Sequence, residues 1–480
     1  MKLSADAVTR ISQQLGRAQL GDPRRSRRLA RVTAKLAAAP SSSIPLALED
    51  DAEVQAAYRL VNNPRVTFES VLAPHIEAAV ESAEKAREIL LVHDTTDCSF
   101  PTLDPDEVGY LQTGKAGFRL HFSLALESET WRRPLGVLHA ETVVRTQRRR
   151  RKRGKVSGSE TAGRADSEFG RWWRGIKSGA DRLAGCKRVI HIADRESDSY
   201  ELMFQAINAK QDFIFRVRVD RRSRNAEAPD AVWSTVKAIA AGCAGTLERE
   251  VALSRRKKKS APRMNKAHPP RKARIARLRF AATRVIIPRP RYLHDPVPST
   301  LELNLVRVFE VDSPEGEPPV EWLLYTTLPV DTKEEVADVV DKYRARWTIE
   351  EFNAALKTGC AYEEREFESR DALLTMLAIS LPIACELLWL RSRARTDPAL
   401  PATDVLTPLQ IQVLRALGKR KLHLHPTAED ALLSVAGLGG HLKRNGAPGW
   451  VVLYRGMQKL KAYEAGWAAA QQAAKREAHL

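Results

Sequence analysis

The spacing of hydrophobic positions changes twice along this chain of 480 residues. Residues 5–85 have the pattern of successive amphipathic helices. From residue 88 short apolar runs typical of buried strands take over, and after about residue 370 the pattern is helical again. We therefore predict a central α/β segment with a helical segment on either side of it.

The central segment alternates between strand and helix patterns. The predicted strands are residues 89–94, 117–126, 134–144, 188–194 and 212–219, and helices are predicted at 168–183 and from residue 195. Three strands, a helix, a strand, a helix and a strand are typical of an α/β unit and not of a sandwich or a helix bundle.

Residues 220–320 interrupt this unit with alternating patterns at 247–253, 274–287 and 301–311. A basic, proline-containing segment at 255–272 separates the first two, and we predict an inserted β subdomain. One more strand is predicted at 321–328. A second basic run, Arg145 to Lys155, lies between a strand and a helix, where we predict a loop that touches phosphates non-specifically.

Length and charge narrow the class of protein. A chain of this length suits two or three domains. Lys and Arg together number 78 and Asp and Glu 59, a net charge of +19, which predicts a polyanionic partner, with nucleic acid the first candidate. A general bias toward basic residues is the alternative.

Other features predict a protein of a reducing cytoplasm. The five cysteines are scattered without a CxxC pair, which argues against a structural zinc site and against a disulfide framework. The N-terminus lacks the apolar core of a signal peptide. The longest apolar run, Leu373 to Leu390, contains Pro382 and Glu386, so we predict a buried helix and not a membrane span.

A small basic module is predicted near the N-terminus. Asp22 can cap a helix whose first turn accommodates Pro23. Arg24, Arg25 and Arg28 follow in that helix, and Arg59 lies near the end of a second one. Such arginines suit phosphate contact and entry into a DNA groove, and a solvated basic face is the alternative.

Two acidic residues follow buried strand patterns. Asp94 and Asp194 each end a hydrophobic run, and acids at the carboxyl ends of neighbouring strands converge at one edge of an α/β sheet. With Glu350 they would form an oxygen-rich site suited to Mg²⁺ or Mn²⁺. His93 and His191 are nearby, and we expect ordinary strand histidines there. The chain has no P-loop, GxSxG or HExxH motif.

The stretch from Tyr343 to Lys357 contains no Pro or Gly and predicts one helix. Tyr343, Arg346, Glu350 and Lys357 would then share an arc of about 60° on one face. A carboxylate among cations can hold a metal ion while its neighbours hold phosphates. A solvated, salt-bridged face is an equally good interpretation of this stretch alone.

These residues carry a resemblance to a known family. His-Asp94-Thr-Thr, Ala-Asp194-Arg-Glu and the spacing of Tyr343, Arg346, Glu350 and Lys357 resemble motifs of the DDE transposases, specifically the IS-four family and the group around the Tn-five transposase. The N-terminal segments around Arg24 and Arg59 resemble that family's end-binding domain. Residues 438–456 resemble, more patchily, its C-terminal dimerisation domain.

The resemblance implies a fold and a division into domains. The fold class is α/β, with an RNase H-like catalytic domain at residues 86–370 that carries the β insertion. A helical domain at 1–85 would bind the element's end DNA, and a helical domain at 371–480 would mediate a homodimer.

The resemblance also implies roles for individual residues. Asp94, Asp194 and Glu350 would hold divalent metal, two Mg²⁺ ions with Mn²⁺ as a substitute. Tyr343, Arg346 and Lys357 would contact phosphates, and Trp322 would stack on a flipped base, a core position in a strand being the alternative. The remaining expected DNA contacts are Arg216, Arg24, Arg25, Arg28 and Arg59.

The implied activity is cut-and-paste transposition: cleavage at the terminal inverted repeats, a hairpin intermediate and joining of the 3′-OH ends to target DNA. Two alternatives remain open. One is a related nuclease that cleaves DNA without joining it. The other is a catalytically silent, DNA-binding inhibitor of transposition, against which the complete set of three acids argues.

Overall fold

The computed structural model describes most of the chain. The described residues are 3–48, 50–129, 133–146, 170–228, 230–245, 247–256, Lys258, Asn265, 269–367, 369–420, 422–442 and 447–477. Most of the basic run predicted as a phosphate-touching loop, residues 147–155, lies outside them. The chain forms two compact units, residues 1–87, 95–151 and 348–480 in the first and residues 88–94 and 152–347 in the second. The three-domain division stays a prediction.

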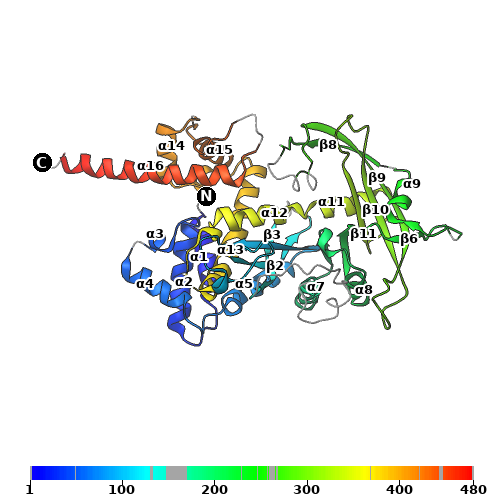
Figure 1. Cartoon of the computed structure of the whole chain (residues 1–480). Helices are drawn as coiled ribbons and strands as arrows, with labels where there is room; N and C mark the ends of the chain where they lie inside the picture. Colours follow the sequence, from blue (N-terminus) through cyan, green and yellow to red (C-terminus); the bar gives the residue numbers. More distant parts are fainter. Residues whose placement is uncertain are drawn as a thin grey trace. The chain divides into compact units, whose positions relative to one another are not determined.

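The first unit begins with a cluster of five helices (Figure 1), which agrees with the helical pattern of residues 5–85. They are α1 (Ala5–Leu15), α2 (Pro23–Ala38), α3 (Ile44–Leu48), α4 (Asp51–Val61) and α5 (Phe68–Ala83). Asp22 caps α2, where its side chain accepts the Arg24 N–H at 2.8 Å, and Pro23 occupies the first turn. This helix start is the predicted one, because capping depends only on neighbours in sequence.

The first unit also contains an antiparallel strand pair, β2 (Gly117–Glu127) and β3 (Pro134–Val143). His75 of α5 lies against β3, where its Nε2 accepts the Val137 N–H at 3.1 Å. Gly136 in β3 has a φ of +147°, and a Cβ there would meet the Ala79 side chain at 2.6 Å. Only glycine therefore lets β3 approach α5 this closely.

A short helix, α6 (Pro105–Val108), precedes β2 in the first unit. Further helices of this unit come after the second unit in the chain. They are α12 (Trp347–Ala354, whose first residue belongs to the second unit), α13 (Arg370–Thr396), α14 (Pro408–Leu417), α15 (Ala428–Leu438) and α16 (Trp450–Glu477). Helix α13 is the one described helix long and apolar enough to cross a membrane, but 78% of its apolar window is buried inside the protein. Leu373 and Leu381 are fully buried, which confirms the prediction of a buried helix.

A mixed sheet forms the centre of the second unit. The full sheet has eleven strands in the order β3-β2-β1-β4-β5-β11-β10-β9-β6-β7, with β8 paired to β9. Besides β2 and β3, the strands are β1 (Ile89–Ser99), β4 (Val189–Ala193), β5 (Asp212–Arg216), β6 (Arg222–Asn225), β7 (Ser234–Thr235), β8 (Leu247–Leu253), β9 (Arg274–Pro288), β10 (Thr300–Val311) and β11 (Glu321–Thr326). Strands β1, β4 and β5 are parallel, and the others pair antiparallel. The α/β class is confirmed.

The strands within residues 220–320 do not form a sheet of their own. Strand β10 pairs along its length with both β9 and β11, so the insertion extends the sheet that starts with β1 and β4 (Figure 1). Buried side chains of β5, β9, β10 and β11 share a hydrophobic core with α7 (Arg171–Arg182) and α8 (Tyr200–Asn208). This common core fixes the strands that carry the candidate site.

The stretch from Tyr343 to Lys357 is not one helix, which corrects the prediction. Helix α11 (Lys333–Arg344) ends first, α12 begins at Trp347, and a π-helical turn follows at Ala355–Gly359. The amides of Ala345 and Arg346 bond to carbonyls three residues back, at 3.0 Å each, which tightens the chain between the helices. The common arc was predicted for one uninterrupted helix, and that premise is wrong.

Candidate active site

Asp94 and Asp194 follow directly on neighbouring parallel strands of the second unit. The parallel pairing of β1 and β4 runs from Ile89 opposite Val189 to His93 opposite Ala193. Each aspartate is the next residue, and both are half-buried. The prediction that the strand ends at Asp94 is wrong, because β1 continues to Ser99. What ends there is the pairing with β4, and this is enough to bring the two acids to the same edge.

The Asp194 carboxylate is held in place by the turn that follows it. Its Oδ1 accepts the Glu196 N–H at 2.8 Å and caps the 3-10 helix Arg195–Ser197. A capping hydrogen bond restricts the side-chain rotamer, so one carboxylate of the pair is oriented before any ligand arrives.

Two histidines, His93 and His191, lie on the same strands shortly before the two acids, and their rings contact each other. His93 and His191 are fully buried and stacked with ring centroids 5.2 Å apart, and His93 Nε2 lies 2.9 Å from His191 Nδ1. The other His191 nitrogen lies 3.2 Å from Gln211 Oε1, and burial lowers the pKa of His191 to about 4. Both His191 nitrogens are therefore occupied, which fits the expected strand histidine and not a metal ligand.

A basic and aromatic cluster lies in the same unit as the two acids. The Trp322 ring makes an edge-on contact with the Tyr343 ring at 5.7 Å between centroids, and the Arg216 guanidinium lies 5.7 Å from the Trp322 centroid. Arg216 is the last residue of β5, Trp322 lies in β11 and Tyr343 in α11. The structure thus brings together three predicted DNA-contacting residues that are far apart in sequence.

Electrostatic effects link this cluster to Asp194. Burial raises the pKa of the Tyr343 phenol, whereas the charges of Arg216 and Arg346 lower it and that of Asp194 raises it. For Arg216 the direction is opposite: burial lowers the pKa of its guanidinium, and the charges of Arg195 and Arg346 lower it further. Tyr343 is only 3% exposed, so it supports its neighbours more than it presents a free hydroxyl.

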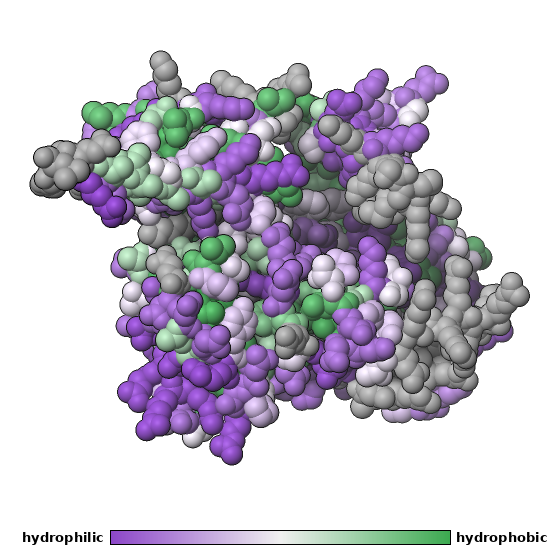
Figure 2. Space-filling view, turned by 60° about the vertical axis from the view of Figure 1, so that its left-hand side comes forward, coloured by the Kyte–Doolittle hydropathy of each residue, from purple (hydrophilic) through white to green (hydrophobic). Residues whose placement is uncertain are grey.

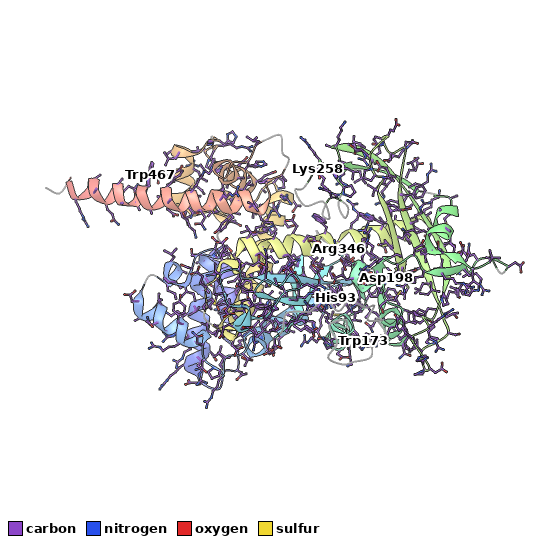
Figure 3. The ribbon with its side chains drawn as sticks, in the orientation of Figure 1. His93, Trp173, Asp198, Lys258, Arg346 and Trp467 are labelled. Carbon is purple, nitrogen blue, oxygen red and sulfur yellow. The ribbon has the colours of Figure 1, made fainter. Side chains whose placement is uncertain are left out.

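Arg195 is a residue that our sequence analysis missed. It is exposed, follows Asp194 directly and lies close enough to Arg216 to affect its pKa. The sequence signal available for Arg195 was a cation that directly follows an acid at the end of a predicted strand. Arg346, at the junction of α11 and α12 (Figure 3), completes a group of three cations in this region.

Glu350 and Lys357 belong to the first unit. Glu350 is exposed on α12, and the unit boundary falls between Trp347 and Thr348. Lys357 lies in the π-helical turn, where its Nζ donates to the Asp97 carbonyl and lies 3.2 Å from Glu363 Oε1. Lys357 is thus engaged by the protein itself in this structure.

The donors suit a hard divalent cation, since carboxylate oxygens are the ligands that Mg²⁺ and Mn²⁺ prefer. The structure places two of the three predicted acids, Asp94 and Asp194, after paired strands. Among the described residues, no group of three His, Cys, Asp or Glu side chains is close enough to hold a metal ion. The role of Glu350 as third ligand therefore stays a prediction.

The predicted basic module forms an exposed surface on the N-terminal helices. Figure 2 shows strongly hydrophilic side chains gathered over these helices at its lower left. Arg28, Arg31 and Arg59 line a groove of about 410 Å³ with Asp50 and Glu53. Arg24, Arg28 and Arg59 are exposed. Arg25 differs, because its guanidinium donates to the Leu20 carbonyl at 2.8 Å and so stabilises the turn before α2.

Two family models match this chain. Residues 10–66 match the family described as Transposase DNA-binding, and residues 173–383 match the family described as Transposase DDE domain. The first match contains the exposed arginines of α2 and α4. The second contains Asp194, the Arg216–Trp322–Tyr343 cluster and Glu350, and it begins after Asp94.

Proposed function

We propose, from the premise that this chain is a DDE transposase with its own DNA-binding domain, that it is a cut-and-paste enzyme of the IS-four family, similar to the Tn-five group. The observation that carries the proposal is the pair Asp94 and Asp194 after parallel strands, in the same unit as the basic and aromatic cluster. We further propose that the fold of residues 86–370 is RNase H-like.

Asp94, Asp194 and Glu350 would hold the divalent metal, which we propose to be two Mg²⁺ ions, replaceable by Mn²⁺. Such ions supply activation of the attacking oxygen and stabilisation of the leaving oxygen in an in-line phosphodiester displacement. The preset orientation of the Asp194 carboxylate means that little ordering is needed on binding.

The cations would hold the DNA backbone during the same steps. Arg346 and Arg216, with Arg195, would neutralise phosphates flanking the cleaved bond, and Lys357 would join them after exchanging its contacts to Asp97 and Glu363. Trp322 would stack on a base extruded from a tight hairpin, which offsets the stacking lost in the duplex.

The proposed sequence is nicking at the element's end, attack of the freed 3′-OH on the opposite strand to form a hairpin, hairpin opening and joining to target DNA. One site can perform all four steps because each is a phosphodiester displacement. We propose that two protomers pair two ends through their C-terminal helices, in the cytoplasm at the bacterial nucleoid.

The test uses the purified full chain, Mg²⁺ and a plasmid that carries the element with its own terminal repeats. We expect release of linear element with blunt or hairpin ends. Asp94→Ala, Asp194→Ala and Glu350→Ala should each abolish release. The matched controls are Asp97→Asn and Glu196→Ala, two exposed acids close in sequence to Asp94 and Asp194, which should keep it.

Each alternative gives a different result. DNA that is nicked but never joined or converted to hairpins would identify a non-joining nuclease. Ends that are bound but not cut with either Mg²⁺ or Mn²⁺ would identify a silent inhibitor. Full activity of Glu350→Ala would show that Glu350 is not a metal ligand. It would not contradict the assignment of the two aspartates.

A further inference from the structure

A cavity of about 280 Å³ lies in the first unit, where α13, α15 and the start of α16 meet. Its polar lining residues are Arg391, Arg395, Arg420, Glu429 and His441, and Leu453 is among its apolar ones. All of them belong to one compact unit and none to the candidate active site. Three guanidinium groups line this one small cavity, and their like charges repel each other unless an anion lies among them.

One of the three arginines is compensated by the protein. Arg391 is 4% exposed, pairs with Glu351 and donates to the Pro448 carbonyl at 3.0 Å. Its guanidinium also lies 4.9 Å from the Trp450 ring centroid, and burial lowers its pKa to about 9. Contacts within the protein therefore fix the Arg391 side chain at the edge of the cavity and already pair its charge.

The other two arginines are more accessible, since Arg395 is exposed and Arg420 is half-buried. Within the described part of the chain, neither Arg395 nor Arg420 has a carboxylate at ion-pair distance. Glu429, the one acid of the lining, is exposed and acts on Arg395 only at longer range, raising its pKa against the lowering by burial. The cavity therefore carries an excess of positive charge.

His441 also lines this cavity and is 9% exposed. Its Nε2 is itself buried, so a ligand in the cavity would contact other atoms of the ring. A bound anion would offset the charges of the guanidinium groups.

We propose that this cavity binds a phosphate group that carries a sugar, as in a nucleotide or a DNA backbone. Guanidinium forks match the geometry of phosphate oxygens. A cavity of this size exceeds what a bare ion needs, and its apolar side, which includes Leu453, suits the carbon framework of the sugar. Binding would tie the start of α16 to α13.

Calorimetric titration of the full chain with dAMP and with inorganic phosphate tests this proposal. We expect dAMP to bind more tightly than phosphate. Arg395→Gln and Arg420→Gln should each weaken dAMP binding about tenfold, the loss typical of one charge-assisted hydrogen bond. Arg393→Gln is the matched control, since Arg393 lies on the same helix, pairs with Asp397 at 3.2 Å and does not line the cavity.

A competition experiment identifies the source of the phosphate. A short duplex that displaces labelled dAMP from the wild type would show that the cavity takes the DNA backbone, and a duplex that leaves dAMP bound would show a nucleotide site. No binding of dAMP or phosphate at millimolar concentration would overturn the proposal. So would equal dAMP affinity of Arg395→Gln, Arg420→Gln and the control, because the ligand would then lie elsewhere.

Discussion

Trp322 is held by protein contacts in the absence of DNA. Arg216 lies over its ring and Tyr343 contacts it edge-on, so a stacked base has to replace or share the contact with Arg216. Base stacking on an aromatic side chain is worth about 1–3 kcal/mol. We therefore expect Trp322→Ala to slow hairpin formation on a pre-nicked end by roughly 10- to 100-fold, measured by gel separation of the products.

Trp322→Phe should keep most of the rate, because it keeps an aromatic face. Trp233→Ala is the matched control in the same unit. That tryptophan lies between Arg222 and Arg224, at 5.0 and 5.5 Å from their guanidinium groups, and belongs to no proposed site. If Trp322→Ala slows nicking and hairpin formation equally, the residue stabilises the fold and does not stack on a base.

His75 makes stability depend on pH. Its Nε2 accepts the Val137 N–H, which requires an unprotonated nitrogen, and burial lowers the pKa of His75 from 6.5 to about 4. The unfolded chain therefore binds a proton that the folded chain excludes between these values, and stability falls as pH falls. From pH 7 to pH 5 we expect a loss of about 2 kcal/mol from this residue.

The urea midpoint of unfolding, measured at pH 7 and pH 5, checks this expectation. His75→Gln should lower stability at pH 7 but show a smaller change between the two pH values. Part of the change should remain, because buried His191 has a similarly lowered pKa. An unchanged pH dependence in His75→Gln would show that His75 does not titrate in this range.

At the scale of elements, local patterns predicted most of the sheet. The predicted strands at 247–253, 274–287 and 301–311 differ from β8, β9 and β10 by at most one residue at an end. Alternating apolar residues identify a strand directly, because each strand residue alternates between two faces. Asp94 and Asp194 could be predicted for the same reason, since each directly follows a buried run.

The break between α11 and α12 could not be predicted in this way. No Pro or Gly marks it, and the residues around it favour helix. Trp347 at its end is 64% exposed, while Ile349 is fully buried. Packing of buried residues on each side thus overrides local preference. The cluster of Arg216, Trp322 and Tyr343 is equally a product of long-range contacts, and only the family resemblance pointed to its members.

Asp198 connects two elements, a role that sequence reasoning did not assign. Its carboxylate accepts the N–H groups of Arg218 and Val219 at 2.6 and 2.8 Å and pairs with Arg221. It thus holds the chain just after β5, which carries Arg216. Removing it leaves Arg221 without this partner, so Asp198→Ala should lower the free energy of unfolding by about 3 kcal/mol.

Thermal unfolding measures this loss. Asp198→Asn keeps an acceptor oxygen, and we expect it to recover part of the stability. The exposed Asp181, which pairs with Lys177 at 2.8 Å on α7, offers a control in Asp181→Ala, with a change of less than about 0.5 kcal/mol. If Asp198→Ala melts at the same temperature as this control, Asp198 does not stabilise the chain after β5 in the way described.

At the scale of the whole molecule, the residues proposed for DNA binding and those proposed for cleavage lie in separate parts of the chain. The exposed arginines of the N-terminal helices lie in the matched DNA-binding region, whereas Asp94 and Asp194 lie in the second unit, directly after the paired segments of β1 and β4. The net charge of +19 predicted a nucleic-acid partner but could not say which surface binds it. Substitutions in the two parts should therefore affect different steps.

The triple variant Arg24→Ala, Arg28→Ala, Arg59→Ala should bind terminal-repeat DNA more weakly and with less dependence on salt. Log K falls as log salt concentration rises, and each lost phosphate contact makes this slope less steep by about 0.9, so three lost contacts make it less steep by about 2.7. Fluorescence anisotropy at several salt concentrations gives this slope. Asp194→Ala should keep the wild-type slope while losing cleavage, because the slope counts the phosphates neutralised by Lys and Arg, and this substitution removes none of those cations. A triple variant with an unchanged slope would place the phosphate contacts outside α2 and α4, and loss of binding in Asp194→Ala would show that the two functions are not separable.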